Sequence, residues 1–124
     1  MSGNRILVDT NIILYLLSGS ESIAQIINNS TIYISFITEL EILSFKEISE
    51  KEKKQIKKIF NEFVIVDINE EIKSKTIEIR SNSSLKLPDS IIAGTAQFLD
   101  LPLLTADKDF QRVKNLDLLL FEND

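Results

Sequence analysis

Apolar residues recur along this chain with two spacings, and each spacing predicts a different kind of element. Continuous runs rich in Ile, Val, Leu and aromatic residues predict buried strands at 5–9, 31–35, 63–66, 103–104 and 118–120. Between these runs, apolar residues return every three or four positions, which predicts helices over 12–17, 22–28, 38–45, 49–60, 70–81 and 88–99. Strands that alternate with helices predict right-handed βαβ units around a parallel sheet.

The predicted helices contain residues whose contacts can be anticipated. In the 49–60 helix, Glu50 is placed to support Lys54 one turn later. The 70–81 helix is expected to turn one face inward, and that face consists of Ile72, Thr76 and Ile79. The 88–99 helix begins at Pro88, and its small residues predict a close approach to the sheet: Ala93, Gly94 and Ala96.

Four acidic residues stand beside apolar segments, near predicted strand ends or in the first half of predicted helices: Asp9, Glu41, Asp89 and Asp107. A carboxylate beside apolar residues costs free energy unless a partner compensates its charge. The sequence near these acids does not contain an equal number of basic residues, so we expect the four carboxylates to share one partner. The natural candidate is a hard divalent cation, Mg²⁺ or Mn²⁺, which prefers oxygen ligands. Because ligands of parallel sheets bind at the carboxyl ends of strands, we expect an acidic pocket at that edge.

Each of these acids also has a purely structural interpretation. Asp9 can cap the helix that follows it, and Asp89 can complement the dipole of its helix. Asp107 can be an ordinary turn residue, and Glu41 can lie with Glu39 on a solvated face. Taken together, these structural interpretations become less convincing. Each of them would have to apply independently to an acidic residue at the same edge of the sheet.

The composition narrows the chemistry available to this chain. Its 124 residues suffice for one domain, 1–124, and it contains no Cys and no His. Disulfides, thiolate metal sites, Ser-His-Asp systems and His-based acid–base catalysis are therefore excluded. The net charge of −5 argues against broad nonspecific binding of nucleic acid. The apolar run near the start, 12–17, is too short to cross a bilayer, and without an export signal the cytoplasm is the default location.

Lysine residues concentrate on the predicted 49–60 helix, at positions 51, 53, 54, 57 and 58. Such a row is most often a solvated helix face. The alternative is a surface that contacts the phosphate backbone of a nucleic acid.

Four segments of this chain occur in the order found in a known nuclease family: residues 6–11, 34–41, 85–93 and 104–110. The chain resembles the PIN-domain nucleases over nearly its whole length. It is most similar to the VapC-like toxins of bacterial and archaeal toxin–antitoxin pairs. The resemblance implies a three-layer α/β/α sandwich with a central parallel sheet. It also implies endoribonuclease activity dependent on Mg²⁺ or Mn²⁺, a homodimer, and inhibition by a small antitoxin encoded alongside.

The resemblance assigns roles to particular residues. Its catalytic acids are Asp9, Glu41, Asp89 and Asp107, and three of them would hold metal: Asp9, Asp89 and Asp107. Glu41 rather than Glu39 is the matching glutamate, judged by its distance from Ser35 and Thr38. The residues expected to orient the carboxylates are Asn11, Thr105 and Asp109.

Other classes of protein remain as alternatives. A non-catalytic PIN-like module that only binds protein or RNA is the main rival, although the full set of four acids argues against it. Receiver domains and haloacid-dehalogenase-type phosphatases are disfavoured, because they carry a second acid close to the first. Here Asp9 is followed by Thr10 and Asn11. A DNA flap nuclease is disfavoured because the chain has no room for the helical arch.

Overall fold

Five parallel strands form the centre of the protein in a computed structural model that describes residues 4–122. Their order across the sheet is β3-β2-β1-β4-β5. The strands are β1 (Arg5–Val8), β2 (Thr31–Ser35), β3 (Val64–Val66), β4 (Leu103–Thr105) and β5 (Leu118–Leu120). The expected α/β fold with a parallel sheet is confirmed.

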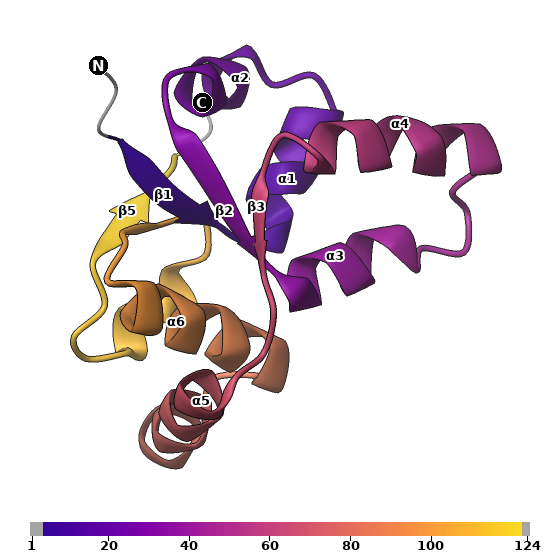
Figure 1. The fold of residues 1–124 in the computed structure, drawn as a ribbon. Helices are drawn as coiled ribbons and strands as arrows, with labels where there is room; N and C mark the ends of the chain where they lie inside the picture. The colour runs from indigo at the N-terminus through magenta and orange to yellow at the C-terminus, as the bar shows by residue number, and fades with distance from the viewer. Residues whose placement is uncertain (1–3, 123–124) are drawn as a thin grey trace.

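Helices lie on both faces of this sheet (Figure 1). They are α1 (Thr10–Leu17), α2 (Glu21–Asn28), α3 (Phe36–Leu43), α4 (Glu50–Phe60), α5 (Glu70–Ser83) and α6 (Leu87–Leu99), with a short 3₁₀ helix, η1 (Lys108–Arg112). Side chains from α1, α2 and α4 pack on one face, and those from α5 and α6 pack on the other. No helix within residues 4–122 has both the length and the apolar character needed to span a bilayer.

Successive residues of the central strand are buried on opposite faces. Ile6 and Val8 belong to the core beneath α1, α2 and α4, whereas Leu7 belongs to the core beneath α5 and α6. Leu103 and Leu104 divide in the same way. Because both faces are covered by helices, the strands are continuous apolar runs without polar alternation.

The strand order reverses between β1 and β4. The chain builds outward from β1 through β2 to β3, then returns to place β4 on the other side of β1. Leu7 lies beside Leu103 and Val8 beside Leu104. In open α/β sheets the crevice at such a reversal, at the carboxyl ends of the strands, is where ligands bind.

Local capping determines where several helices begin. Ser35 Oγ accepts a hydrogen bond from the Ile37 N–H, so α3 begins at Phe36, two residues before the predicted start, and ends at Leu43. In α4, Ser49 and Glu52 form a capping box, which agrees with the start expected near residue 49. The inward face expected for α5 is confirmed, and the helix continues to Ser83.

Two of the anticipated contacts are wrong in detail. Glu50 pairs with Lys53 at 3.7 Å, three residues on, and not with Lys54. Gly94 faces α5 and not the sheet, since a Cβ at this position would lie 2.9 Å from Thr76 Oγ1. The packing of α5 against α6 therefore explains the glycine.

Candidate active site

Asp9 is held at the reversal point by two hydrogen bonds. It follows β1 and caps α1, where its Oδ1 accepts from the Ile12 N–H at 3.0 Å. Its Oδ2 accepts a short hydrogen bond from the hydroxyl of Thr105, the last residue of β4. Thr105 Oγ1 in turn accepts from the Asp107 N–H at 3.0 Å. The capping interpretation of Asp9 is thus geometrically correct, but the cap accounts for only one of the two oxygens.

The environment of Asp9 disfavours its charged form. The residue is only 4% exposed, and burial raises the pKa of its carboxyl from 3.8 to about 6. The negative charges of Asp89 and Asp107 raise the pKa further, while the bonds from Thr105 and Ile12 lower it. Asp9 is therefore a buried carboxylate among other acids, and in the part of the chain that the structure describes no basic side chain forms an ion pair with it.

Asp89 is coupled electrostatically to acidic residues from other elements of the fold. It lies half-buried in the first turn of α6. Burial raises the pKa of its carboxyl, and the charges of Asp107 and Glu41 raise it further. Lys86 opposes this shift, and Asp109 adds to it. Because these couplings act over short distances in proteins, residues far apart in the sequence have been brought into one electrostatic cluster.

A hydrogen bond from α1 orients the side chain of Glu41, which belongs to α3. Its Oε1 accepts a hydrogen bond of 2.6 Å from the hydroxyl of Thr10, which lies 3.1 Å from the hydroxyl of Thr38. Glu41 also contributes to the pKa shift of Asp89, whereas Glu39 does not figure in it. Glu41 is thus the glutamate that contacts Thr10, and its choice over Glu39 as a site residue stays a prediction.

Asp107 and Asp109 lie where β4 passes into η1. Asp107 caps η1, and its Oδ1 accepts from the Asp109 N–H at 2.9 Å, so the turn interpretation of this segment also describes its geometry. The carboxylate of Asp109 is half exposed and pairs with Arg112 at 3.3 Å. Asp109 thus belongs to the rim of the cluster, where its charge is partly compensated.

Thr10 is the contact that the sequence analysis missed. The adjacent Asn11 was expected to orient a carboxylate, but its side chain is exposed and makes no hydrogen bond within the described part of the chain. Both residues are polar, and they are the first two residues after Asp9. Only the packing of α1 against α3 determines which of them faces Glu41.

The donor set suits a hard divalent cation. Among residues 4–122, the three ion pairs are Lys53–Glu50, Lys73–Glu70 and Arg112–Asp109, so none neutralises the four predicted acids. The available atoms are carboxylate oxygens, which Mg²⁺ and Mn²⁺ prefer. No group of three or more acidic side chains within 4–122 is placed so that it could hold a metal ion. These acids therefore supply the donor atoms that such a cation prefers, but not, as they stand, a metal-binding geometry.

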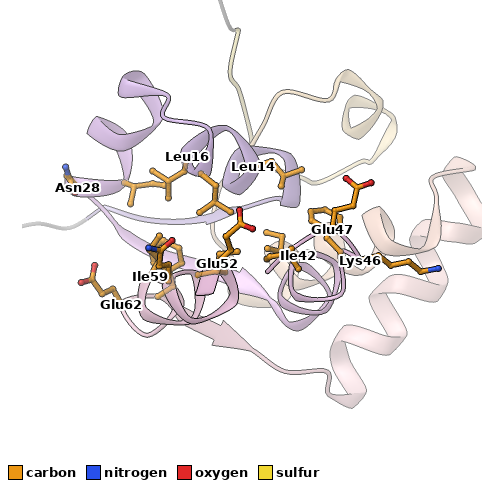
Figure 2. A pocket seen from close by; sticks show the side chains of 16 residues that line it. Leu14, Leu16, Asn28, Ile42, Lys46, Glu47, Glu52, Ile59 and Glu62 are labelled. Atoms are coloured by element: carbon orange, nitrogen blue, oxygen red, sulfur yellow. The ribbon is translucent and has the colours of Figure 1, made fainter. Parts of the chain in front are cut away.

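A separate apolar groove of about 830 Å³ lies between α1 and α2 on one side and α3 and α4 on the other (Figure 2). Apolar side chains line most of it, including Leu14, Leu17, Ile42, Phe45 and Ile59. Its charged lining residues are mostly acidic: Glu47, Glu52 and Glu62, with Lys46. None of the four predicted catalytic acids lines this groove or the polar cavity of about 620 Å³ beside α5, α6 and the 112–117 loop. The expected acidic pocket is thus not one of these two cavities.

Comparison with known proteins gives a consistent result. The sequence profile of the PIN domain matches residues 6–116. A toxin–antitoxin complex from Klebsiella pneumoniae contains a chain 30% identical to this one, with a TM-score of 0.80 over 92% of this chain and 95% of that chain. VapBC-1 from nontypeable Haemophilus influenzae gives 25% identity and a TM-score of 0.79, covering 94% and 97% of the two chains.

A third solved structure is similar in fold. VapBC2 from Rickettsia felis, bound to a DNA fragment from its promoter, gives a TM-score of 0.85 at 23% identity over 95% of this chain and 99% of that chain. The structural neighbours of this chain include VapC-type toxins of VapBC complexes. Comparison with curated protein sequences gives no significant match.

Proposed function

This chain belongs to the PIN-domain family, and from that premise we propose that it is a divalent-metal-dependent endoribonuclease, the toxin of a toxin–antitoxin pair. One observation carries the proposal: Asp9 is buried at the reversal point of the sheet and coupled electrostatically to Asp89 and Asp107, and no basic side chain within residues 4–122 pairs with it. A cluster of this kind is destabilising for folding alone and becomes favourable when a cation is shared.

Asp9, Asp89 and Asp107 would hold one or two Mg²⁺ or Mn²⁺ ions, directly or through water, and Glu41 would complete the cluster. When bound, the metal lowers the pKa of a coordinated water and neutralises charge that develops on the phosphate. The chain's own contribution is orientation. Ile12 and Thr105 fix both oxygens of Asp9, so this carboxylate does not have to reorganise when RNA binds.

The expected products follow from attack by water on phosphorus. The RNA 2′-hydroxyl is not the nucleophile in this route, so the fragments carry 5′-phosphate and 3′-hydroxyl ends. No His is needed, in agreement with a chain that contains none.

The proposed partner is a small antitoxin that occupies the apolar groove. The relatives from Klebsiella pneumoniae and Haemophilus influenzae were crystallised as toxin–antitoxin or VapBC complexes. The groove offers an apolar floor with Glu47, Glu52 and Glu62 among its lining residues. This lining is complementary to an amphipathic segment with an apolar face and basic flanks. We also propose the homodimer that the family implies, which the mass in solution by light scattering would test.

The decisive experiment is cleavage of a mixed pool of structured RNAs with Mg²⁺ or Mn²⁺. Controls are the same reactions with EDTA and with the Asp9→Asn protein. We expect discrete fragments that require both the metal and Asp9, and end-labelling would identify their termini. RNA binding without cleavage under any metal would instead support a non-catalytic RNA-binding module.

A further inference from the structure

The hydroxyl of Thr10 joins the first helix of the protein to the third. Thr10 is the first residue of α1 and directly follows Asp9. Its Oγ1 lies 2.6 Å from Glu41 Oε1 and 3.1 Å from Thr38 Oγ1, and both of these residues belong to α3. One hydroxyl therefore connects the helix that Asp9 caps to the helix that carries Glu41.

The chemistry of the three groups determines the direction of these hydrogen bonds. An ionised carboxylate only accepts, so Thr10 donates its single proton to Glu41. Thr10 Oγ1 then has no proton left for Thr38, and Thr38 must donate to Thr10. The result is a relay from Thr38 through Thr10 to Glu41, in which each bond polarises the next.

Burial and covalent connection make this relay stiff. Thr38 is fully buried, and Thr10 is half-buried and β-branched, which restricts its χ1 angle. Since Thr10 is bonded to Asp9, whose carboxylate is itself held by Ile12 and Thr105, the relay relates the position of Glu41 to that of Asp9. Asp9, which caps α1, and Glu41, which belongs to α3, are thereby held in a fixed relative position.

We propose that Thr10 is a positioning residue, which holds the Glu41 carboxylate in register with the metal-binding acids. This inference rests on the proposed function, because it assigns Thr10 a role toward the same cation. The alternative is that Thr10 only fastens α1 to α3. A fastening role predicts a loss of stability without a loss of metal affinity, so the two can be separated by measuring both.

The test compares Thr10→Val, which keeps the shape and removes the hydroxyl, with Thr10→Ser, which keeps the hydroxyl. Thr76→Val is the matched control, because it removes a buried hydroxyl that bonds to Ile72 O within α5. The readouts are Mn²⁺ affinity without RNA, the Mg²⁺ concentration for half-maximal cleavage, KM for RNA at saturating metal, and thermal stability in EDTA. Thr38→Val, which removes only the upstream donor, provides a second variant.

We expect Thr10→Val to weaken Mn²⁺ binding by roughly 10–100-fold and to raise the Mg²⁺ requirement in parallel, with KM for RNA unchanged. Thr10→Ser should restore most of the affinity, Thr38→Val should show a smaller loss, and Thr76→Val should bind Mn²⁺ as the wild type does. If the wild type binds Mn²⁺ and Thr10→Val binds it equally well, the positioning role is wrong while the proposed function stands. If the wild type neither binds metal nor cleaves RNA, the proposed function fails and this inference fails with it.

Discussion

The Thr105 hydroxyl donates a hydrogen bond to Oδ2 of Asp9, although the two residues are 96 positions apart in the sequence. They meet because β1 and β4 are neighbouring parallel strands, and each residue stands at the carboxyl end of its strand. This hydrogen bond connects the ends of β1 and β4, where the strand order reverses. It also ties Asp107 to Asp9, since Thr105 Oγ1 accepts from the Asp107 N–H. The geometry of the acidic cluster therefore depends on the pairing of β1 with β4.

Stability without metal should fall as the pH rises through the range in which Asp9 loses its proton. The folded-state pKa of Asp9 is raised to about 6 from 3.8, so between these values the folded protein holds a proton that the unfolded chain has released. The contribution of Asp9 to stability is therefore lost as pH rises from about 4 to above 6, by on the order of 3 kcal/mol. Asp9→Asn removes this penalty and keeps a side chain that caps α1.

Urea denaturation in EDTA, repeated from pH 4 to 8, measures this effect. We expect Asp9→Asn to gain stability relative to the wild type as pH rises, while its ribonuclease activity is lost. A difference between the two proteins that does not change with pH would contradict the assignment. A clear loss of stability in the variant at pH 7 would favour a structural role for Asp9 as a cap.

Divalent cations should stabilise the wild type by relieving the repulsion among the acids. A ligand that binds only the folded state raises the free energy of unfolding by about 2.7 kcal/mol when its concentration is 100 times its Kd. Thermal unfolding with increasing Mn²⁺ should therefore show a rising Tm in the wild type, reversed by EDTA. Asp9→Asn should show little rise, and an equal rise in both proteins would place the cation elsewhere.

Replacing Thr105 by Val should impair catalysis more than folding. The substitution removes the bond to Asp9 Oδ2 and the acceptor of the Asp107 N–H, so both carboxylates lose a fixed orientation. Loss of such a supporting contact typically costs roughly 10–100-fold in metal affinity or activity. Steady-state cleavage rates at saturating RNA measure the effect. Thr95→Val is the control, because the Thr95 hydroxyl, among residues 4–122, bonds only to Ile91 O within α6.

An acidic substitution in the groove should weaken antitoxin binding without affecting the nuclease. Phe45 lines the groove and is 44% exposed, so Phe45→Glu should leave the core intact while placing a charge on an apolar contact surface. Leu119→Glu is the matched control, since Leu119 is also 44% exposed but lies on β5, outside the groove. Calorimetry with the proposed antitoxin should show a loss of affinity of about tenfold or more for Phe45→Glu alone. Equal affinity of both variants would exclude the groove as the binding site.

Gly94→Ala should destabilise the protein, against the usual preference of helices for alanine. The new Cβ would lie 2.9 Å from Thr76 Oγ1 and 3.3 Å from the Thr76 backbone N. Overpacking of this kind costs about 1–3 kcal/mol, which exceeds the gain of about 1 kcal/mol expected from helix propensity. Denaturation midpoints should show the loss. Adding Thr76→Ala should recover part of it, and strictly additive effects would indicate that the two residues do not collide.

The sequence by itself determined the α/β class, the positions of the elements and the four acids beside them. These follow from local rules: strand and helix periodicities are properties of neighbouring residues, and caps such as Asp9 and Ser49 act within one turn. The predicted ends of the helices differ from the observed ends by up to two residues, as in α3. The reason is that capping geometry, and not apolar spacing, determines where a helix begins.

Only the tertiary structure decided which distant side chains meet. The strand order placed Thr105 against Asp9, and the packing of α1 on α3 turned Thr10 instead of Asn11 toward Glu41. The packing of α5 on α6 likewise explains Gly94. The physical reason is the same in each case. A helical residue's partner depends on the rotation and crossing of whole helices, which are determined by the combined burial of many side chains and are not written in any one segment.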